Sequence, residues 1–513
     1  MTLVFSPNHR GENTRLSEKE IVPVPFQKVC VEDNFWSNRI GLMNKVSVPF
    51  ALEHGDFAIK RLKMCADYRL GRSEELPPRH RFVSSDLYKT LEAAAYSLEY
   101  ERNPEIEAFA DSVIAIIAEA QQDDGYLYID HICKNPNLME EGPLPYSKHL
   151  ASHELYNMGH LYEAAIAYYQ ATGKDKLLQV ALKSVAHINQ VMFTGGDPNY
   201  NSGKPINISS GHEEIEIALS KLNRLTGDEL YLDMARKFLD IRGVTFVGEK
   251  YGQHHAPVRV QRTAEGHAVR AGYLYYSMAL VDALSGTHEY TDALHAIWNN
   301  IVSSKIHITG GLGAVHSSEG FGKEYELPNK NAYNETCAAV ANVFFNYQMF
   351  LNEGKADYLD IMELSLFNCA LAGISADGTK FYYENPLECD GIRCFNKGGN
   401  VRDSWFDCAC CPPNILRLIL QTPGYMYAHS DHAIYLTLYA SSSTEIPLPS
   451  GRVHLRQQSN YPWDGHVRLE VTPPAACRAL SSSSGYHHGL VRISSYQDGC
   501  ITSRSHHRRL LSN

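Results

Sequence analysis

Four glycine-marked corners, each joining two segments of helical apolar period, place the strongest limit on how this chain can fold. They lie at Gly173, Gly227, Gly286 and Gly354. Glycine after the last periodic residue is a C-terminal signal of a helix, because it enters the left-handed cap without strain. The tripeptide RNP at 102–104 marks a similar corner, since Pro suits the first turn of a helix. We therefore predict a series of helical hairpins from about residue 83 to 375.

The interval between successive glycines holds two helices of ordinary length with their loops, which gives about ten to twelve helices in about six pairs. Two concentric rings of such pairs form an (α/α)6 barrel, and an open α-solenoid is the alternative. The intervals lengthen along the chain, whereas a solenoid usually keeps its period. We predict a mainly α protein with an (α/α)6-barrel catalytic domain.

After about residue 425 the apolar period changes from that of helices to that of strands. Apolar and polar residues alternate, with turn signals between the runs, in 432–448, 451–465 and 466–474. This predicts an incomplete β-sandwich domain, and the Ser- and His-rich tail after it is expected to be poorly ordered. The predicted N-terminal segment, barrel, partial sandwich and tail are 1–24, 25–428, 429–475 and 476–513.

Composition excludes several classes of protein. With 44% apolar and 20% charged residues among 513, the chain can bury a large core and is not disordered throughout. The net charge of −11, without a long basic cluster before the C-terminal end, argues against nucleic-acid binding. The apolar runs are far shorter than the roughly 18 residues of a membrane span, and the N-terminus lacks the apolar core of a secretory signal. We expect no membrane partner and a cytoplasmic location.

The strongest chemical signal is the sequence DCACCPPN at 407–414. Adjacent thiols cannot easily bridge each other, and thiolates gathered in a reducing compartment indicate a metal, zinc first. Asn414 can cap the helix predicted after the prolines, and a thiolate near a helix start has a lowered pKa. Scattered cysteines elsewhere are interpreted as small buried apolar residues. Cys408 receives no role.

A second motif, NETCAAVANVFF at 334–345, supplies candidates for the other half of a metal site. Glu335 and Cys337 stand two residues apart at the start of an apolar helix. With Cys410 and Cys411 they make a Cys3Glu set, and a carboxylate ligand is atypical of structural zinc and suggests a working site. The alternative is that Glu335 only interacts with the helix dipole and Cys337 only packs in the core.

Four longer segments carry a resemblance to a known family. They are HELYNMGHLYEAAIAYYQATGK (153–174), GHEEIEIALSKLNRLTGD (211–228), ITGGLGAVHSSEGFGKEYELPNKNAYNETCAA (308–339) and CACCPPNILRLI (408–419). Together they resemble glycoside hydrolase family 127, whose known activity is β-L-arabinofuranosidase. The resemblance runs from about residue 25 to about 475, includes YPWDG at 461–465, and does not extend into the tail. The order of ETC and CACCPPN is highly specific to it.

This resemblance implies a retaining, zinc-dependent exo-glycosidase that releases terminal β-L-arabinofuranose from an oligosaccharide or arabinoside. It implies that the Cys410 thiolate attacks the anomeric carbon and that Glu319 is the general acid/base. The implied Zn²⁺ ligands are Glu335, Cys337, Cys410 and Cys411. The implied sugar contacts are His153, His212, His267 and Tyr383.

The chemistry of these residue types agrees with those roles. A retaining glycosidase places a nucleophile and a proton donor on either side of the scissile bond. Cysteine is rare as the nucleophile, and zinc would keep it ionised and stabilise sulfur as it departs. Glu319 lies in a Gly/Ser-rich loop, which suits the mouth of an active site. Without the resemblance, however, a solvated loop carboxylate is the preferred interpretation of Glu319, and helix capping explains the three histidines as well as sugar contact does.

Two other functions remain open at this stage. A zinc enzyme of another class, such as a thiol-activating cyclase or transferase, would require an open coordination position for the substrate sulfur. A non-catalytic sugar-binding protein would hold a structural zinc ion and show no turnover. Unfinished sandwich strands would also leave edges for pairing in a homodimer.

Overall fold

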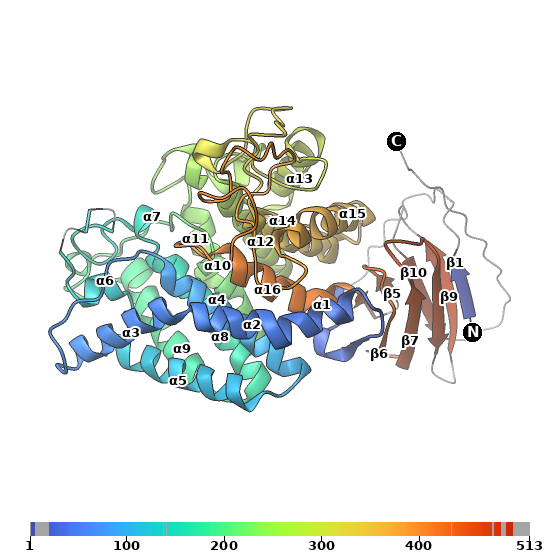
Figure 1. Ribbon diagram of the computed structural model, residues 1–513, viewed down its shortest axis with the longest axis horizontal. Coiled ribbons are helices and arrows are strands. Elements are labelled where there is room, and N and C mark those ends of the chain that lie inside the picture. The colour runs from blue at the N-terminus through green and yellow to red at the C-terminus, as the bar shows by residue number, and fades with distance from the viewer. Residues whose placement is uncertain are drawn as a thin grey trace. The chain divides into compact units, whose positions relative to one another are not determined.

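The computed structural model describes residues 2–5, 20–136, 138–139, 141–431, 433–473, 477–483 and 489–495. The chain forms two compact units that interleave along the sequence (Figure 1). The helical unit comprises 44–345 and 367–417, and the sheet unit comprises 1–43, 346–366 and 418–513. Each unit is described by itself below.

The α-helices are Trp36–Leu42 (α1), Val48–His54 (α2), Asp56–Arg69 (α3), Val83–Tyr100 (α4), Pro104–Ala120 (α5), Ile129–Ile132 (α6), His149–Ser152 (α7), Glu154–Thr172 (α8), Lys176–Asn189 (α9), Ile215–Thr226 (α10), Glu229–Ile241 (α11), Ala268–Ser285 (α12), Thr291–Asn300 (α13), Thr336–Glu353 (α14), Ala356–Ser365 (α15) and Cys411–Gln421 (α16). Among the residues described, none of these is both long and apolar enough to cross a membrane.

Burial separates two sets of helices in the helical unit. Helices α4, α8, α10 and α12 are buried on almost every side, as inner helices are, while α5, α9 and α11 bury one stripe. The stripe of α5 contains Ile106, Ala110, Val113 and Ile117. Helix α4 packs against α8, α8 against α10 and α10 against α12, and the outer helices lie against this inner set (Figure 1). The predicted barrel-like fold of paired helices is confirmed.

The glycine corners have the conformation that the sequence predicts. Gly173, Gly227 and Gly286 follow α8, α10 and α12 with φ of 74°, 72° and 65°, and each backbone N–H bonds back into the preceding helix. Gly354 follows α14 with φ of 69°. At the RNP corner, the Asn103 side chain accepts bonds from the backbone N–H groups of Glu105 and Ile106. Capping signals therefore place the hairpin turns of the barrel.

The strands form two five-stranded antiparallel sheets in the sheet unit, with orders β1-β8-β7-β6-β3 and β2-β4-β5-β10-β9. The strands are Thr2–Phe5 (β1), Val22–Pro23 (β2), Val29–Val31 (β3), Tyr427–His429 (β4), Ala433–Leu436 (β5), Ser442–Leu448 (β6), Gly451–Ser459 (β7), Val467–Thr472 (β8), Cys477–Ser483 (β9) and Gly489–Ser495 (β10). In β6, β7 and β8 buried and more exposed residues alternate, so one face packs inward. Ile446 pairs with Val453 and Leu455 with Val471 across this buried face.

Three N-terminal strands and two strands of the tail were not expected. β1, β2 and β3 pair with β8, β4 and β6, which follow them by several hundred residues. Strands β9 and β10 lie within 476–513, where the sequence predicts no regular structure, and β10 pairs with β5 and β9. Pairing with strands far along the chain orders β1, β2 and β3, and pairing with β5 joins β10 and its neighbour β9 to a sheet, which local periodicity does not indicate. The rest of the tail and 6–19 lie outside the described residues.

The interpretation of the scattered cysteines is partly wrong. Cys65, Cys133 and Cys369 are buried as expected, but Cys30, Cys389 and Cys394 are exposed. Cys30 is the middle residue of edge strand β3, and the other two lie in the loop before α16. An edge strand and a loop present side chains to solvent that sequence hydropathy alone assigns to the core.

A buried set of charged side chains crosses the middle of the helical unit. Arg417 Nη1 lies 2.9 Å from Glu92 Oε2 and 2.5 Å from Glu163 Oε2, and Lys221 pairs with Glu163. Burial raises the pKa of Glu214 well above its usual value and the Glu163 carboxylate adds to this, so Glu214 keeps its proton. Two cations thus face two carboxylates and one neutral acid. We call this set of side chains the buried charge network, and its members are Glu92, His160, Glu163, Glu214, Lys221 and Arg417.

Candidate active site and metal centre

The four predicted metal ligands lie at the starts of two helices. Glu335 immediately precedes α14 and Cys337 lies in its first turn, while Cys410 immediately precedes α16 and Cys411 is its first residue. Three of them are buried, and Cys410 is partly exposed. The N-terminus of a helix favours negative charge, so both positions suit thiolates and carboxylates.

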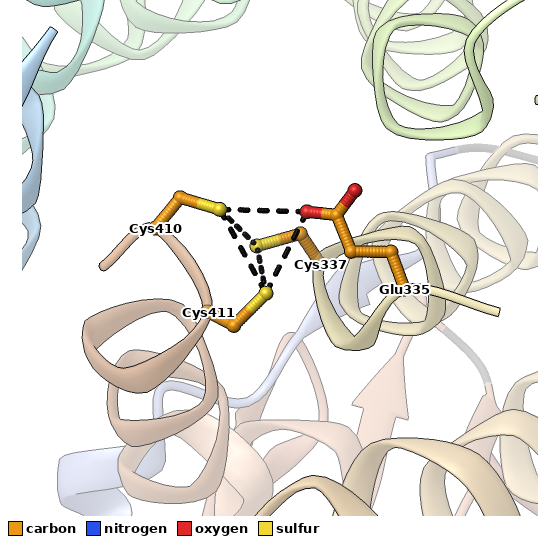
Figure 2. Close-up of side chains that lie close together, drawn as sticks. All are labelled: Glu335, Cys337, Cys410 and Cys411. Carbon is orange, nitrogen blue, oxygen red and sulfur yellow. Dashed lines mark hydrogen bonds between the residues drawn. The ribbon is translucent and has the colours of Figure 1, made fainter. Parts of the chain in front are cut away.

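The four side chains converge on one centre (Figure 2). The sulfur of Cys337 lies 3.3 Å from that of Cys411 and 3.6 Å from that of Cys410, and the other two sulfurs are 3.7 Å apart. Glu335 Oε1 lies 3.4 Å from Cys410 Sγ and 3.5 Å from Cys411 Sγ. Ordinary Zn–S and Zn–O bonds in a tetrahedron give edges of about 3.8 Å between sulfurs and about 3.5 Å from sulfur to oxygen. The spacing and the donor chemistry fit a zinc ion.

The electrostatics of the cluster also fit a cation. Burial raises the pKa of Glu335 well above its usual value, and the neighbouring Cys410 sulfur raises it further. Burial and the hydrogen bonds with the other thiols raise the pKa of Cys411, whereas at Cys337 such hydrogen bonds outweigh burial and lower the pKa to about 6. Oε2 of Glu335 is buried without a hydrogen-bond partner among the residues described. The carboxylate thus turns Oε1 toward the sulfurs and leaves Oε2 without a partner in the described part of the chain, which suits a group that a cation binds.

Glu319 lies in a short loop that is fastened to the start of α12. It follows the 3-10 turn His316–Ser318 with a left-handed φ of 52°, and Gly320 forms β-bridges with His267 and Val315. Its Oε2 lies 3.0 Å from His267 Nε2, and its Oε1 lies 3.9 Å from Lys397 Nζ. Burial raises the pKa of this carboxyl, but His267 and Lys397 outweigh burial and lower it to about 2. Glu319 is therefore ionised in this arrangement.

The three predicted sugar-binding histidines lie side by side at helix starts. The ring of His212 lies 6.1 Å from that of His153 and 6.0 Å from that of His267, measured between centroids. Burial lowers the pKa of each, to about 3 for His153 and well below the usual value for His212, and the Arg270 guanidinium adds to this. All three imidazoles are therefore neutral, so each keeps one ring nitrogen that can accept a hydrogen bond.

Backbone contacts fix which ring nitrogen of each histidine carries a proton. Nδ1 of His153 lies 2.8 Å from the Ala151 carbonyl and Nδ1 of His212 lies 2.9 Å from the Glu213 carbonyl, so both nitrogens donate. Their Nε2 atoms are left as acceptors. Nδ1 of His267 instead accepts from two N–H groups at the start of α12, so its Nε2 donates to Glu319.

Tyr383 connects the thiol cluster to the loop before α16. Its hydroxyl lies 3.2 Å from Cys410 Sγ and 3.7 Å from Cys408 Sγ, and Lys397 Nζ lies 4.0 Å from the centre of its ring. Its backbone N–H donates to the Asn396 side chain and its carbonyl accepts from Thr336 N–H. Both of its backbone partners therefore hold the ring beside Cys410. Cys408 lines the cavity but is absent from the converging metal-ligand set.

These groups share one cavity of about 540 Å³. Its lining includes every predicted site residue except Cys411, which is fully buried behind the others. A volume of this size falls within the range of small-ligand sites. The cavity is lined by residues of the helical unit, from α4 to the start of α16.

Sequence reasoning missed a buried pair on α4 that supports the loop carrying Cys410. Lys89 Nζ donates to the Cys410 carbonyl over 3.2 Å and to the Tyr156 hydroxyl over 3.3 Å, and it lies 3.6 Å from Asp86 Oδ1. Asp86 Oδ2 accepts from Ala409 N–H over 3.1 Å. Opposite charges at i and i+3 near the start of a predicted helix were the available signal, since buried charges need specific partners.

Comparison with known proteins places these features in context. Residues 28–424 match the family model described as the β-L-arabinofuranosidase, GH127 catalytic domain. A curated non-reducing end β-L-arabinofuranosidase of Bifidobacterium longum is 38% identical over 448 residues, which cover 82% of this chain and 66% of that protein. The chain thus spans about two thirds of the length of this relative.

Two solved structures are similar over most of the chain. One is a GH127 β-arabinofuranosidase with 36% identity and a TM-score of 0.81, covering 93% of this chain and 80% of that one. The other is a GH127 β-L-arabinofuranosidase from Geobacillus stearothermophilus T6 with 34% identity and a TM-score of 0.81. The match covers 92% of this chain and 80% of that one.

Proposed function

This chain belongs to glycoside hydrolase family 127, and we propose that it is a retaining exo-glycosidase that releases terminal β-L-arabinofuranose. The substrate is an oligosaccharide or a small arabinoside. The observation that carries the proposal is the convergence of the Cys410 thiol, its three companion donors and the Glu319 loop on one cavity. The activity named for the similar proteins supports the choice of sugar.

Cys410 is the proposed nucleophile. Its thiolate attacks the anomeric carbon, the bond from that carbon to the leaving oxygen breaks, and Glu319 gives a proton to that oxygen. In the second step water attacks the same carbon, Glu319 takes a proton from the water, and the carbon–sulfur bond breaks to restore the thiolate. Two displacements at one carbon retain its configuration.

Glu319 has to change protonation state between these steps. The hydrogen bond with His267 and the nearby Lys397 favour the carboxylate, which is the form that the second step needs. A sugar that fills the cavity would displace water and disfavour the charged form, which raises the pKa toward that of an acid catalyst. A leaving oxygen near Glu319 would also compete with His267 for its oxygen atoms.

Glu335, Cys337, Cys410 and Cys411 are the proposed zinc ligands. When bound, zinc would keep the sulfurs ionised at neutral pH and favour sulfur as a leaving group. The chain's own contribution is to hold Cys410 in place, through Tyr383 at its sulfur and Lys89 at its carbonyl. His153 and His212 would accept hydrogen bonds from sugar hydroxyls through Nε2.

Hydrolysis of an aryl β-L-arabinofuranoside by the purified full chain tests the proposal, together with quantification of bound zinc. Cys410→Ser is expected to lose at least about a thousandfold in kcat, since a covalent catalyst is removed. Glu319→Gln should lose most activity and regain part of it with a substrate whose aryl leaving group needs no protonation. Full activity of Cys410→Ser, or no activity of the wild type with zinc bound, would refute it.

The same variants separate the two rival functions. In a cyclase or transferase that activates a substrate thiol, the four converging protein donors would leave no coordination position for that thiol. In a sugar-binding protein with structural zinc, the wild type would bind arabinosides without turnover and Glu319→Gln would bind equally well. We propose a cytoplasmic location, because the thiols must stay reduced, and keep the homodimer as a prediction that light scattering can test.

A further inference from the structure

The sheet unit carries a second hollow that shares no lining residue with the active-site cavity. It encloses about 320 Å³ between the segment leading into α1 and the chain around β6, β7 and the turn after β7. We call it the sheet pocket and define it by Asn34, Phe35, Arg39, Asn460 and Trp463. Its volume lies at the lower end of the range for small-ligand sites, about 300 Å³ and upward.

Trp463 gives the sheet pocket a large exposed aromatic face. Its side chain is 74% exposed, whereas Trp36 nearby in the same unit is fully buried. The Trp463 backbone N–H donates to the Asn460 carbonyl over 3.0 Å, and its ring meets Phe35 edge-on with 6.3 Å between centroids. The ring thus contacts one aromatic neighbour while most of its surface stays open. An exposed indole beside a hollow lined with polar groups suits a binding surface.

The polar groups around this ring suit a neutral ligand rich in hydroxyls. The side-chain amides of Asn34 and Asn460 make no hydrogen bond to any residue that the structure describes, and each offers a donor and an acceptor. The Arg39 guanidinium lies 3.7 Å from the centre of the Phe35 ring and donates one bond to the Phe35 carbonyl. Its remaining N–H groups are therefore held in a fixed direction.

The charges at the sheet pocket argue against an anionic ligand. Arg39 interacts electrostatically with Asp33, whose Oδ1 accepts from the N–H of Trp36 over 2.6 Å at the start of α1. Glu32, the other acid of the lining, is bound by Ser443 and Arg456. The guanidinium groups of Arg39 and Arg456 are thus balanced by the carboxylates of Asp33 and Glu32, so the pocket carries no surplus of positive charge to attract a phosphate or a carboxylate.

We propose that the sheet pocket is a second carbohydrate-binding site, which takes a stretch of a neutral glycan. One sugar ring stacks its C–H face on Trp463, and the amides of Asn34 and Asn460 and the Arg39 guanidinium bond its hydroxyls. Such a site would hold a long glycan on the enzyme and raise the local concentration of chain ends. The proposal is about binding and does not depend on the reaction at Cys410.

Affinity electrophoresis of the full chain in native gels containing soluble arabinan, or dextran as a second neutral glycan, tests this binding. The wild type should be retarded, and Trp463→Ala should weaken the apparent affinity by about tenfold, the effect of removing a central aromatic contact. Tyr325→Ala is the matched control, because Tyr325 is equally exposed, at 74%, and lines neither cavity. It should migrate as the wild type does.

Two further measurements keep the result interpretable. Asn460→Ala removes a hydrogen-bonding group without an aromatic ring and should weaken retardation to a smaller degree, while thermal unfolding of all variants checks that they fold. Trp463→Ala should leave kcat/KM on a small aryl arabinoside unchanged. Absence of wild-type retardation in both gels, or equal retardation of Trp463→Ala, overturns the proposal. Retardation without any hydrolysis would refute the proposed function and leave this site standing.

Discussion

The pocket histidines show how single residues are tuned by their own backbone. His153 and His212 each donate one ring N–H to a neighbouring backbone carbonyl. Both rings are buried, which lowers their pKa, so neither binds a second proton easily. The positions of these histidines at helix starts could be predicted from the sequence. Their neutrality could not, because it depends on burial and on Arg270 of another helix start.

As the pH falls, this protein should therefore begin to lose stability at a higher pH than protonation of its carboxylates alone would cause. An unfolded chain protonates these imidazoles below about pH 6.5, whereas the folded chain leaves His153 neutral down to about pH 3. Stability is thus fully present above about pH 6.5 and is lost as the pH falls through this window, by about 1.4 kcal/mol per pH unit for each imidazole.

His153→Asn checks this prediction, because asparagine tolerates the left-handed backbone at this position, where φ is 63°. Urea unfolding at pH 7 and pH 5 should show a smaller pH dependence for the variant, by about the uptake of one proton. An unchanged pH dependence of the variant would show that His153 does not titrate as stated.

Loss of the buried Lys89 side chain should strongly destabilise the site. Lys89→Met leaves the fully buried Asp86 carboxylate without its cation, and breaking such a pair costs about 3–5 kcal/mol. The double variant Lys89→Met/Asp86→Asn removes both charges and should recover part of the loss. Chemical denaturation of the wild type, both single variants and the double variant measures this coupling. A double variant less stable than Lys89→Met would contradict it.

At the scale of elements, the sequence predicted the hairpin corners but not the distances between inner helices. Capping glycines act locally, so Gly173 and Gly227 could be recognised in a single sequence. The approach of α8 to α10 depends on a small residue, Gly159, inside α8. Its hypothetical Cβ would lie 2.5 Å from Glu214 Cγ and 2.9 Å from backbone atoms at the start of α10. The sequence shows only a glycine inside a helix, and it does not indicate that another helix packs against this position.

Helix propensity alone would predict that alanine inside α8 stabilises the protein. We expect instead that, of two glycine-to-alanine changes, the one inside α8 lowers the stability more. Gly159→Ala adds a good helix former inside α8, yet overpacking against α10 should cost about 1–3 kcal/mol or more. Gly227→Ala places a Cβ in open space, so only the left-handed backbone opposes it, at about 1–2 kcal/mol. Thermal unfolding should give the lower midpoint for Gly159→Ala. The reverse order would mean that α8 can move away from α10 at little cost.

At the scale of the whole molecule, the mainly α class, the barrel-like fold and the change to strands near residue 425 were predictable, because each produces a local period. The membership of β1, β2 and β3 in the sheets was not, because each is short and pairs with residues far along the chain. The four side chains proposed to hold zinc come from two motifs separated by about seventy residues. Residue chemistry and the family resemblance predicted that these side chains converge, whereas periodicity gives no signal for this.

Removing the N-terminal strands should expose sheet edges. Deletion of residues 1–31 takes away β1, β2 and β3, which lie at the ends of their sheets beside β8, β4 and β6. The uncovered backbone groups of these strands would then be available to other molecules, which favours association. Size-exclusion chromatography with light scattering should show dimers or larger species at concentrations where the full chain keeps its smaller size. A shortened chain of unchanged size distribution would contradict this.

The buried charge network has a consequence for anyone who wishes to redesign this enzyme. Its cations and acids come from α4, α8, α10 and α16, so no member can gain or lose charge without stranding a partner. Random mutagenesis that changes one codon at a time will therefore find that these positions tolerate almost no substitution. A combinatorial library in which whole charge-neutral blocks are exchanged together would reach alternative sequences that stepwise selection cannot.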